Sequence, residues 1–418
     1  MGSVCSKVYV LGIGYSPLSE RAKEVLRSSA NILTSTRLME VFKTYPIFSE
    51  LKDKVSVIDG VDNTLEFLRE WIAQRSSGIV VLASGDPMFY GIGRRISQEL
   101  GKENVVIIPE LSSIQLAFAR IKEPWDNAFL MSVHGGPYPK RRINRYGVED
   151  IPYFLNLYGR LCILTDPQNN PKLIAHTLYR FFDRGEGIRM YVAERLGYED
   201  ERIISGSPQE LKEKEFRDPN VVILIMDGHR PSKRFGFRGN EISHEEGLIT
   251  KDEVRAVILH KIAPPQKGVF WDIGAGSGSI SLEISSLFPE LEVFAVEKDS
   301  RMSKHLLENL RRYKARYRIV EGEAPEALNS LPHPDRVFVG GSGGRLNDIL
   351  GYLRDQRVGH MVFVATLFES LNLILRGLSG DLYEVEVVQL SAHISKPLSN
   401  SWYLVSQNPV FVITARER

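Results

Sequence analysis

Short apolar runs recur along the chain, and most are followed by stretches in which apolar residues return every three or four positions. A short apolar run bounded by turn residues is typical of a buried strand. Apolar residues that return every three or four positions are typical of a helix. Strands are predicted at residues 7–14, 78–83, 104–108, 129–133, 160–164, 188–193, 220–226, 269–273, 291–297, 317–320, 336–339, 361–365, 384–389 and 410–414. Helices are predicted at 19–28, 64–75, 170–182 and 250–259, and from residue 112 onward. This alternation predicts an α/β protein with largely parallel sheets.

A break in the pattern divides the chain into domains. Residues 229–245 contain glycine, proline and charge without a period, which is typical of a linker. We expect a first domain at 1–228, with α/β lobes at about 1–122 and 123–228, and a second domain at 246–418. A hairpin-like pair at about 384–394 and 402–414 predicts one antiparallel edge strand in the second domain. Thr250, with Glu253 three residues later, predicts a capping box at the start of that domain's first helix.

Composition narrows the class of protein. A chain of 418 residues is too long for one ordinary core, in agreement with several domains. Its 53 basic and 52 acidic residues nearly cancel, so the net charge predicts neither nucleic acid nor a membrane as a partner. Cys5 and Cys162 cannot form a disulfide framework, and apolar runs such as 221–226 are far shorter than the ~20 residues of a spanning helix. Since the start also lacks a leader pattern, we expect a cytoplasmic protein.

The strongest candidate site follows the predicted strand at 269–273. Gly274, Gly276 and Gly278 lie between this strand and a helix, where residues without a Cβ let a ligand approach the main chain. Glu297 ends the next strand, and a carboxylate at this distance can accept hydrogen bonds from both hydroxyls of a ribose. Asp272 would repel a pyrophosphate but suits a cationic amino-acid ligand. The pattern favours S-adenosylmethionine over NAD, and a loop that merely links strand and helix is the alternative.

A second candidate loop follows the predicted strand at 78–83. Gly85, Asp86 and Pro87, with glycines at 91 and 93, constrain the backbone at the C-terminal end of a strand. Open α/β sheets bind their ligands at such strand ends. Ser112 and Ser113 stand at the start of a predicted helix, where they can form hydrogen bonds with the same ligand.

Two sets of motifs carry a resemblance to known families. In the second domain they are Thr250–Ala256, Asp272–Gly278, Gly340–Gly344 and Asn408–Val410. This half resembles the class I methyltransferases and, more narrowly, the decarboxylating precorrin methyltransferases of cobalamin synthesis. In the first domain they are Leu11–Gly14, Ala83–Gly93, Ser112–Ser113, Pro124–Trp125 and Val133–Gly135, which resemble the tetrapyrrole methylases. Together they span almost all of the chain and resemble the fused precorrin-6B C5,15-methyltransferase (decarboxylating) family.

The resemblance implies a two-lobed tetrapyrrole methylase fold followed by a class I, Rossmann-like methyltransferase sheet. It implies two S-adenosylmethionine sites, one for methylation of a precorrin or cobalt-precorrin at C5 by the first domain. The other would serve methylation at C15 with decarboxylation of the C12 acetate by the second domain, without a metal. Both families suggest a homo-oligomer. The expected cofactor-binding residues are Gly12, Gly14, Gly85, Asp86, Pro87, Ser112, Ser113, Thr250, Gly274, Gly276, Gly278, Glu297, Glu323 and Ala324. The expected substrate-binding residues are His134, Arg141, Arg142, Gly341, Ser342 and Gly343.

Other interpretations stay open on the sequence. Thr250 is also explained as a plain helix cap, His134 as a satisfied histidine at a strand end, and Lys140–Arg145 as a solvated loop. For the whole chain, one alternative is an RNA base methyltransferase with an appended domain. Another is an enzyme in which one half is a non-catalytic scaffold.

Overall fold

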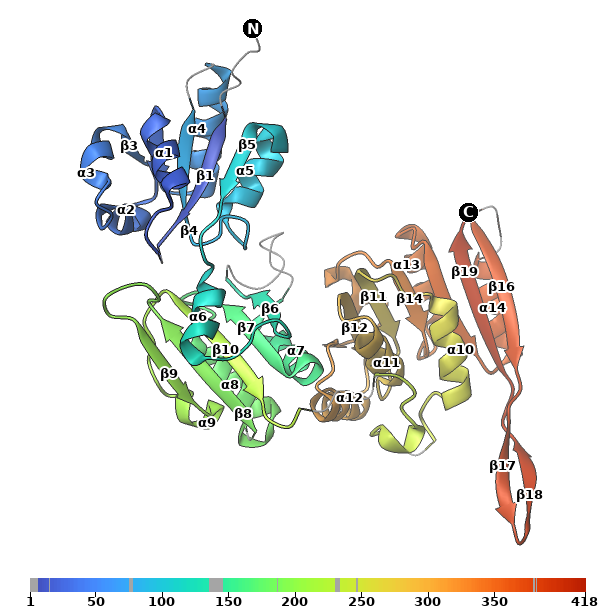
Figure 1. Ribbon diagram of the computed structural model, residues 1–418. Helices are drawn as coiled ribbons and strands as arrows, with labels where there is room; N and C mark the ends of the chain where they lie inside the picture. The colour runs from blue at the N-terminus through green and yellow to red at the C-terminus, as the bar shows by residue number, and fades with distance from the viewer. Residues whose placement is uncertain are drawn as a thin grey trace. The chain divides into compact units, whose positions relative to one another are not determined.

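The structure is a computed structural model of the 418-residue chain. It describes residues 7–14, 16–74, 78–134, 146–185, 187–229, 234–245, 247–378, 380 and 382–418. The chain forms two compact units, Met1–Arg230 and Pro231–Arg418 (Figure 1). Within the described ranges, no helix combines the length and the apolarity needed to cross a lipid bilayer.

The first lobe of the first unit is built on a parallel sheet with the strand order β3-β2-β4-β1-β5. Its strands are β1 (Val8–Ile13), β2 (Asn31–Thr34), β3 (Val55–Val57), β4 (Ile79–Ser84) and β5 (Val105–Ile108). Its helices are α1 (Glu20–Ser28), α2 (Thr36–Lys43), α3 (Phe48–Leu51), α4 (Val61–Ala73) and α5 (Ile92–Leu100). The central strands β1 and β4 are almost completely buried, as their continuous apolar sequences predict. Ser19 caps α1 by accepting a hydrogen bond from the Ala22 N–H (3.2 Å), which explains why this helix begins where the sequence predicts it.

The second lobe of the first unit contains a mixed sheet with the strand order β6-β7-β10-β8-β9. Its strands are β6 (Phe129–Ser132), β7 (Arg160–Leu164), β8 (Ile188–Glu194), β9 (Arg202–Gly206) and β10 (Asn220–Met226). Its helices are α6 (Ser113–Ile121), α7 (Ile151–Tyr158), α8 (Pro171–Phe181) and α9 (Pro208–Leu211). The sequence analysis included α6 in the first lobe, but Ile114 and Phe118 pack in a core with Ile223 of β10. The chain therefore enters the second lobe before α6, because the apolar face of this helix is covered there.

The second unit is built on a seven-stranded sheet with the order β13-β12-β11-β14-β15-β19-β16. Its strands are β11 (Gly268–Ile273), β12 (Leu291–Glu297), β13 (Arg318–Glu321), β14 (Arg336–Val339), β15 (His360–Ala365), β16 (Tyr383–Leu390) and β19 (Val410–Glu417). One face packs against α10 (Asp252–Ile262), α11 (Ser279–Leu287) and α12 (Ser300–Tyr313), and the other against α13 (Leu346–Asp355) and α14 (Phe368–Leu378). Phe270 and Trp271 of β11 enter opposite cores, so the strand is apolar except for Asp272 near its end.

The antiparallel strand of this sheet does not lie at the edge, contrary to the prediction from the hairpin-like pair. β19 runs antiparallel to both of its neighbours, β15 and β16, and β16 forms the edge. The burial pattern explains the order. Residues 411–415 of β19 are buried without interruption and need cover on both faces, whereas β16 is half-buried or exposed over most of its length.

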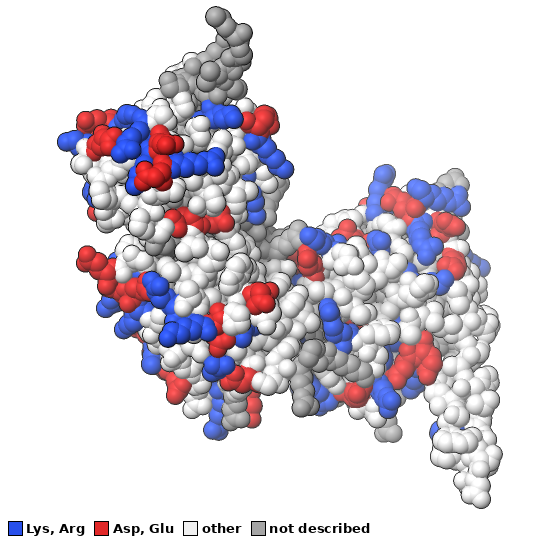
Figure 2. Space-filling model, viewed as in Figure 1, with Lys and Arg blue, Asp and Glu red and all other residues white. Residues whose placement is uncertain are grey.

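A hairpin projects from the sheet between β16 and β19. It consists of β17 (His393–Leu398) and β18 (Ser401–Ser406), which pair only with each other. Large apolar side chains are exposed on it, including Trp402 at 69% and Leu404 at 66%. Figure 2 shows this hairpin, at the lower right, as almost uncharged, and Lys396 is the only Lys, Arg, Asp or Glu in its two strands.

The segment predicted as a linker, 229–245, is partly built into the second unit. Phe237 and Ile242 are buried in the core beside α10 and α11. Glu283 of α11 accepts hydrogen bonds from the N–H groups of Gly236 and Phe237, both at 3.1 Å. Arg255 of α10 donates to the Phe237 carbonyl and pairs with Glu283 (Nε to Oε1, 3.2 Å). The segment has no periodic pattern because individual side chains and a 3-10 helix of only three residues, Gly239–Glu241, hold its described residues in place.

Candidate functional site

The glycine loop of the second unit connects β11 to α11, at the C-terminal end of a central strand. Gly274, Gly276 and Gly278 all have positive φ, of +67°, +58° and +79°. A Cβ on Gly274 would clash with the Gly341 carbonyl oxygen, and one on Gly278 with the Leu306 side chain. At Gly276 the space around a Cβ is open. Gly274 and Gly278 are therefore required by packing, whereas Gly276 is the position that leaves main chain accessible.

Glu297, at the end of β12, turns its carboxylate toward this loop. Its Oε2 accepts a hydrogen bond from the Gly276 N–H at 2.8 Å. Its Oε1 accepts from the N–H groups of Lys298 (2.8 Å) and Asp299 (2.9 Å). Glu297 is only 8% exposed, and these hydrogen bonds hold its carboxylate in one position beside the loop.

A cavity of about 180 Å³ opens at the ends of β11, β12, β13 and β14. It brings together most of the predicted residues of the second unit: Gly274, Glu297, Glu323, Ala324, Gly341, Ser342 and Gly343. Gly276, Gly278 and Thr250 are not on its wall. Lys298 is on the wall and was not predicted; its Nζ lies 2.7 Å from Glu323 Oε1 and 3.4 Å from the Gly343 carbonyl oxygen. Lys298 thus connects the loop after β13, which contains Glu323, with the loop after β14, which contains Gly343.

Asp272 is buried beneath the start of α11. Its Oδ2 accepts hydrogen bonds from the Ser281 hydroxyl (2.6 Å) and the Ser281 N–H (3.1 Å). Its Oδ1 is buried and has no hydrogen-bond partner in the described part of the chain. Burial raises the pKa of this carboxyl from its ordinary 3.8 to about 7, although the hydrogen bonds from Ser281 oppose that change.

Thr250 does not form the predicted capping box. The N-cap of α10 is Lys251, which makes no side-chain capping bond, and Asp252 and Glu253 lie in the first turn of the helix. Acidic residues in that position interact favourably with the helix dipole, so they replace the cap. The main-chain carbonyl of Thr250 accepts a hydrogen bond from Arg255 Nη1 at 2.9 Å, which ties the residue to the buried pair of Arg255 and Glu283.

The loop after β4 in the first unit is shaped by close main-chain contacts. Gly12 lies against it, and a Cβ there would clash with the Gly85 carbonyl oxygen. Asp86 Oδ1 accepts a hydrogen bond from the Met88 N–H (2.8 Å), which forms a side-chain turn around Pro87. The N–H of Gly14 donates to the Tyr45 hydroxyl at 2.9 Å. Gly12, Gly85 and Pro87 therefore determine the shape of the loop, Gly14 is bonded instead to Tyr45, and all four lie outside the cavity walls described next.

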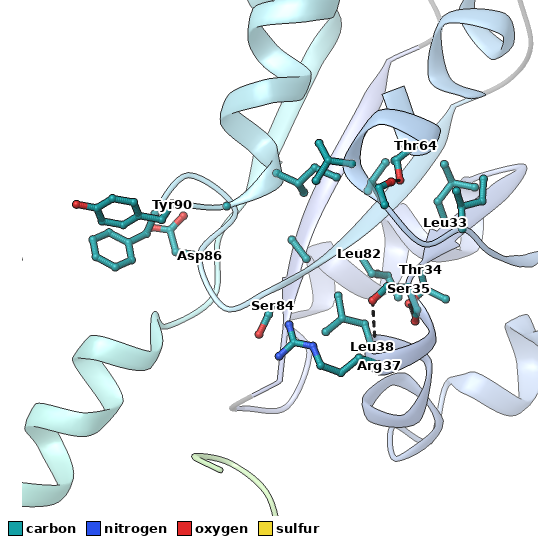
Figure 3. Close-up of a pocket in the computed structure, with 18 of the residues that line it drawn as sticks. Leu33, Thr34, Ser35, Arg37, Leu38, Thr64, Leu82, Ser84, Asp86 and Tyr90 are labelled. Carbon is teal, nitrogen blue, oxygen red and sulfur yellow. Dashed lines mark hydrogen bonds between the residues drawn. The ribbon is translucent and has the colours of Figure 1, made fainter. Parts of the chain in front are cut away.

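Two neighbouring cavities, of about 420 and 610 Å³, open beside this loop. Asp86 and Ser112 line the smaller one, His134 lines the larger one, and Ser113 lines both. Figure 3 shows the smaller cavity, with Arg37 and Ser84 on one side and Asp86 and Tyr90 on the loop that follows β4. Both volumes fall in the range of typical ligand sites.

The predicted polar residues of the first unit differ in what else they contact. Ser112 is engaged in a capping box with Gln115 at the start of α6, whereas Ser113 has no such bond. His134 is exposed, and its Nδ1 lies 3.3 Å from the Thr165 carbonyl oxygen. Arg141 and Arg142 lie outside the described residues. Arg37 and Arg94 line the larger cavity and were not predicted, because nothing in the sequence separates them from arginines on the surface.

Comparison with known proteins gives a match for each half of the chain. Residues 7–212 match the family described as tetrapyrrole (corrin/porphyrin) methylases, and residues 241–414 match the precorrin methyltransferase domain. A relative from Sinorhizobium sp, named precorrin-6Y C(5,15)-methyltransferase [decarboxylating], is 30% identical over 342 residues, which cover 80% of this chain and 78% of the relative. This chain belongs to the precorrin-6Y C(5,15)-methyltransferase (decarboxylating) family.

Other similar proteins cover less than half of this precorrin-6Y C(5,15)-methyltransferase family member. One from Sulfolobus acidocaldarius, named probable cobalt-precorrin-6B C(15)-methyltransferase (decarboxylating), is 32% identical over 189 residues, covering 44% of this chain and 98% of the relative. A crystal structure titled precorrin-6y C5,15-methyltransferase from Geobacter metallireducens is 39% identical, with a TM-score of 0.43, and covers 44% of this chain and 100% of its own.

Membership in the precorrin-6Y C(5,15)-methyltransferase family has direct consequences. The chain is a methyltransferase of cobalamin biosynthesis, and its methyl donor is S-adenosylmethionine. The alternative of an RNA base methyltransferase is not supported.

Proposed function

We propose that the chain carries two S-adenosylmethionine sites and acts on one precorrin substrate at two positions. The second unit methylates C15 and decarboxylates the C12 acetate, and the first unit methylates C5. The observation that carries the proposal is that each unit has its own cavity at the C-terminal ends of parallel strands, beside a glycine-shaped loop. The division of labour rests on the relative named for C15 methylation and decarboxylation, which covers 44% of this chain and so has the length of one unit, and on the precorrin methyltransferase match to residues 241–414.

In the second unit, the residues that we assign to the cofactor converge from three strand ends. Bound S-adenosylmethionine supplies a methyl group already activated by its sulfonium. Glu297 receives the ribose hydroxyls with its fixed carboxylate, and Glu323 and Ala324 lie where the adenine belongs. Asp272, whose Oδ1 has no partner in the described ranges, and Thr250 serve the amino-acid end; Gly274 and Gly276 offer the main chain, and Gly278 shapes the loop. Positioning of this kind supplies ~7–11 kcal/mol of a reaction barrier.

The loop Gly341–Gly343 at the end of β14 is assigned to the macrocycle. It shares the cavity with the cofactor residues, so a flat ligand on it would lie beside the donor methyl group. In the decarboxylation, the bond between the acetate methylene and its carboxyl carbon breaks and CO2 leaves. The electron pair passes into the conjugated macrocycle, and a proton then completes the methyl group. The role of the chain is to hold the acetate in place and to exclude water.

In the first unit, the two neighbouring cavities together have room for a cofactor and part of a macrocycle. We assign Asp86, Ser112 and Ser113 to the cofactor side, with Gly12, Gly14, Gly85 and Pro87 shaping the loop. His134 is assigned to the substrate, as are Arg141 and Arg142.

The proposal also covers location and assembly. We expect a cytoplasmic enzyme without a nucleic-acid or membrane partner, in keeping with the near balance of 53 basic and 52 acidic residues. We expect more than one copy in the assembly, in keeping with the exposed apolar residues of the β17–β18 hairpin.

The experiment assays the full-length enzyme with a precorrin substrate and 13C-methyl-labelled S-adenosylmethionine, with cobalt-free and cobalt-bearing substrates in parallel. NMR distinguishes methyl groups at C5 and C15, and mass spectrometry follows the loss of CO2. Gly276→Asp, which puts a carboxylate beside Glu297, should abolish C15 methylation and decarboxylation and leave C5 methylation intact. Asp86→Ala, which removes the hydrogen bond from the Met88 N–H, should abolish C5 methylation and leave C15 methylation and decarboxylation intact.

Matched controls are Gly351→Asp, in open space on α13, and Asp126→Ala on the exposed surface. Both should keep all three activities. Isothermal titration should find two S-adenosylmethionine sites per chain. One site, or loss of both methylations with Gly276→Asp and of neither with Asp86→Ala, would show that the first unit is a scaffold.

A further inference from the structure

The larger cavity of the first unit has a one-sided charge distribution. Arg37, Arg94 and Arg95 lie on its wall, together with His134. Among the described residues that line it there is no aspartate or glutamate. A cavity lined by cations alone concentrates anions, since the low-dielectric walls screen the field less than water does.

The three arginines differ in their partners. Arg95 Nη2 lies 3.0 Å from Asp62 Oδ1, so part of its charge is neutralised within the protein. In the described part of the chain, neither Arg37 nor Arg94 has a salt bridge or a hydrogen bond to a carboxylate. These two guanidinium groups keep their donors available for a ligand.

Local structure does not explain why arginine stands at these positions. Arg37 is the second residue of α2 and Arg94 the third residue of α5, so each lies in the first turn of its helix. A cation there is disfavoured by the helix dipole. Neither first turn contains an acid, nor does that of α6, which begins at the same cavity with Ser113. Asp62 in the first turn of α4 and Glu20 in that of α1 are acids at this edge, and neither is on the cavity wall.

The placement of Arg37 adds a geometric point. It lines both cavities, together with Ser84 and Tyr90. Figure 3 shows its guanidinium reaching from α2 toward Ser84 at the end of β4. A ligand that spans the two cavities would pass this side chain.

We propose that Arg37 and Arg94 bind carboxylate groups of the tetrapyrrole substrate and orient its ring for methylation by the first unit. The inference rests on the proposed function, in which that substrate is a precorrin bearing acetate and propionate groups. A guanidinium matches a carboxylate with two parallel hydrogen bonds, which fixes direction as well as distance. Two such contacts on separate helices would fix the rotation of the macrocycle and so determine which carbon faces the methyl donor.

The test uses the full-length enzyme and the variants Arg37→Gln and Arg94→Gln. Each should raise the KM for the precorrin in C5 methylation about 10-fold or more, because a charge-assisted pair is lost. The double variant should raise it further, and the Arg→Lys variants should fall between. The KM for S-adenosylmethionine should change less than twofold. C15 methylation and decarboxylation should stay at wild-type rates, and an unchanged KM for S-adenosylmethionine in C5 methylation shows that the first unit, which carries both arginines, is folded.

Arg21→Gln is the matched control, because Arg21 is exposed on α1 of the same lobe and lines neither cavity. The inference is overturned if the cavity variants behave like this control. It is also overturned if the affinity for S-adenosylmethionine falls instead, which would assign the arginines to the carboxylate of the cofactor. A wild-type enzyme that never methylates C5 would refute the proposed function of the first unit. Binding of a polycarboxylated tetrapyrrole, followed by its absorbance, would then still test the two arginines.

Discussion

The buried carboxyl of Asp272 offers a sharp test of the glycine-loop site. The residue is 1% exposed, and its Oδ1 has no partner in the described ranges. Ionisation of this group in the folded protein is therefore unfavourable, and its pKa is raised to about 7. The variant Asp272→Asn keeps an oxygen that accepts the two hydrogen bonds from Ser281 and cannot ionise.

The magnitude follows from the pKa of the folded state. The difference between about 7 and the ordinary 3.8, at about 1.4 kcal/mol per pKa unit, corresponds to about 4 kcal/mol. The folded state binds the proton more tightly than the unfolded state, so the contribution of Asp272 to stability is present at low pH. It is lost as the pH rises from about 4 to about 7. Relative to wild type, Asp272→Asn should therefore gain roughly 3–4 kcal/mol of stability between pH 4 and pH 8.

The assay is hydrogen exchange with mass spectrometry on peptides of β11 and β12, because a two-unit chain does not have a single unfolding free energy. The stability difference between variant and wild type is measured at each pH. The change of this difference between pH 4 and pH 8 is free of the constant effect of the amide group. Asp355→Asn, on the exposed end of α13, is the matched control and should show no such pH dependence. S-adenosylmethionine should bind Asp272→Asn about 10-fold more weakly at pH 8, because the ammonium group of the cofactor loses the charged carboxylate of Asp272.

Two results would refute this reasoning. A stability difference that stays constant from pH 4 to pH 8 would show that Asp272 ionises in the folded protein as easily as in the unfolded one. A variant with unchanged affinity for S-adenosylmethionine would show that Oδ1 does not face the cofactor, and the acid before the loop would have only a structural role.

Three further predictions concern packing. Gly276→Ala, in open space at φ +58°, should cost about 1–2 kcal/mol and leave measurable C15 activity, whereas Gly274→Ala should abolish that activity, because its Cβ would clash with the main chain of Gly341. Hydrogen exchange of β11 peptides and methyl transfer check both, and equal effects would contradict the assigned difference. Arg255→Met should destabilise the second unit by about 3–5 kcal/mol, because Glu283 is left buried without its cationic partner. Adding Glu283→Leu should recover much of that loss, as measured by hydrogen exchange of α10 and α11. A double variant less stable than the single one would argue against the pairing. Cys162 is fully buried, and burial raises the pKa of its thiol. In the native protein at pH 8 this thiol should therefore resist alkylation by iodoacetamide and react only after unfolding. Rapid labelling of the native protein would contradict its burial in the second lobe.

The sequence was sufficient where a single local pattern decides the structure. The alternation of apolar runs and helical periods predicted the α/β class, because burial on both faces of a parallel sheet requires continuous apolar strands. Glycines at 274, 276 and 278 and the acid at 297 predicted the loop beside β11, since the three glycines have positive φ and the Glu297 carboxylate accepts a hydrogen bond from the Gly276 N–H. The resemblance of each half to a known family is confirmed by the matches over residues 7–212 and 241–414.

Features that depend on contacts between distant segments were visible only in the tertiary structure. The position of β19 inside the sheet, the packing of α6 on the second lobe and the anchoring of Phe237 by Arg255 and Glu283 follow from which surfaces cover each other, and sequence periodicity carries no such information. The same holds for Arg37 and Arg94, which are 57 residues apart and look like ordinary surface arginines. Strand ends that meet at one edge of a sheet bring them to one cavity, and only that convergence gives their charges a common ligand.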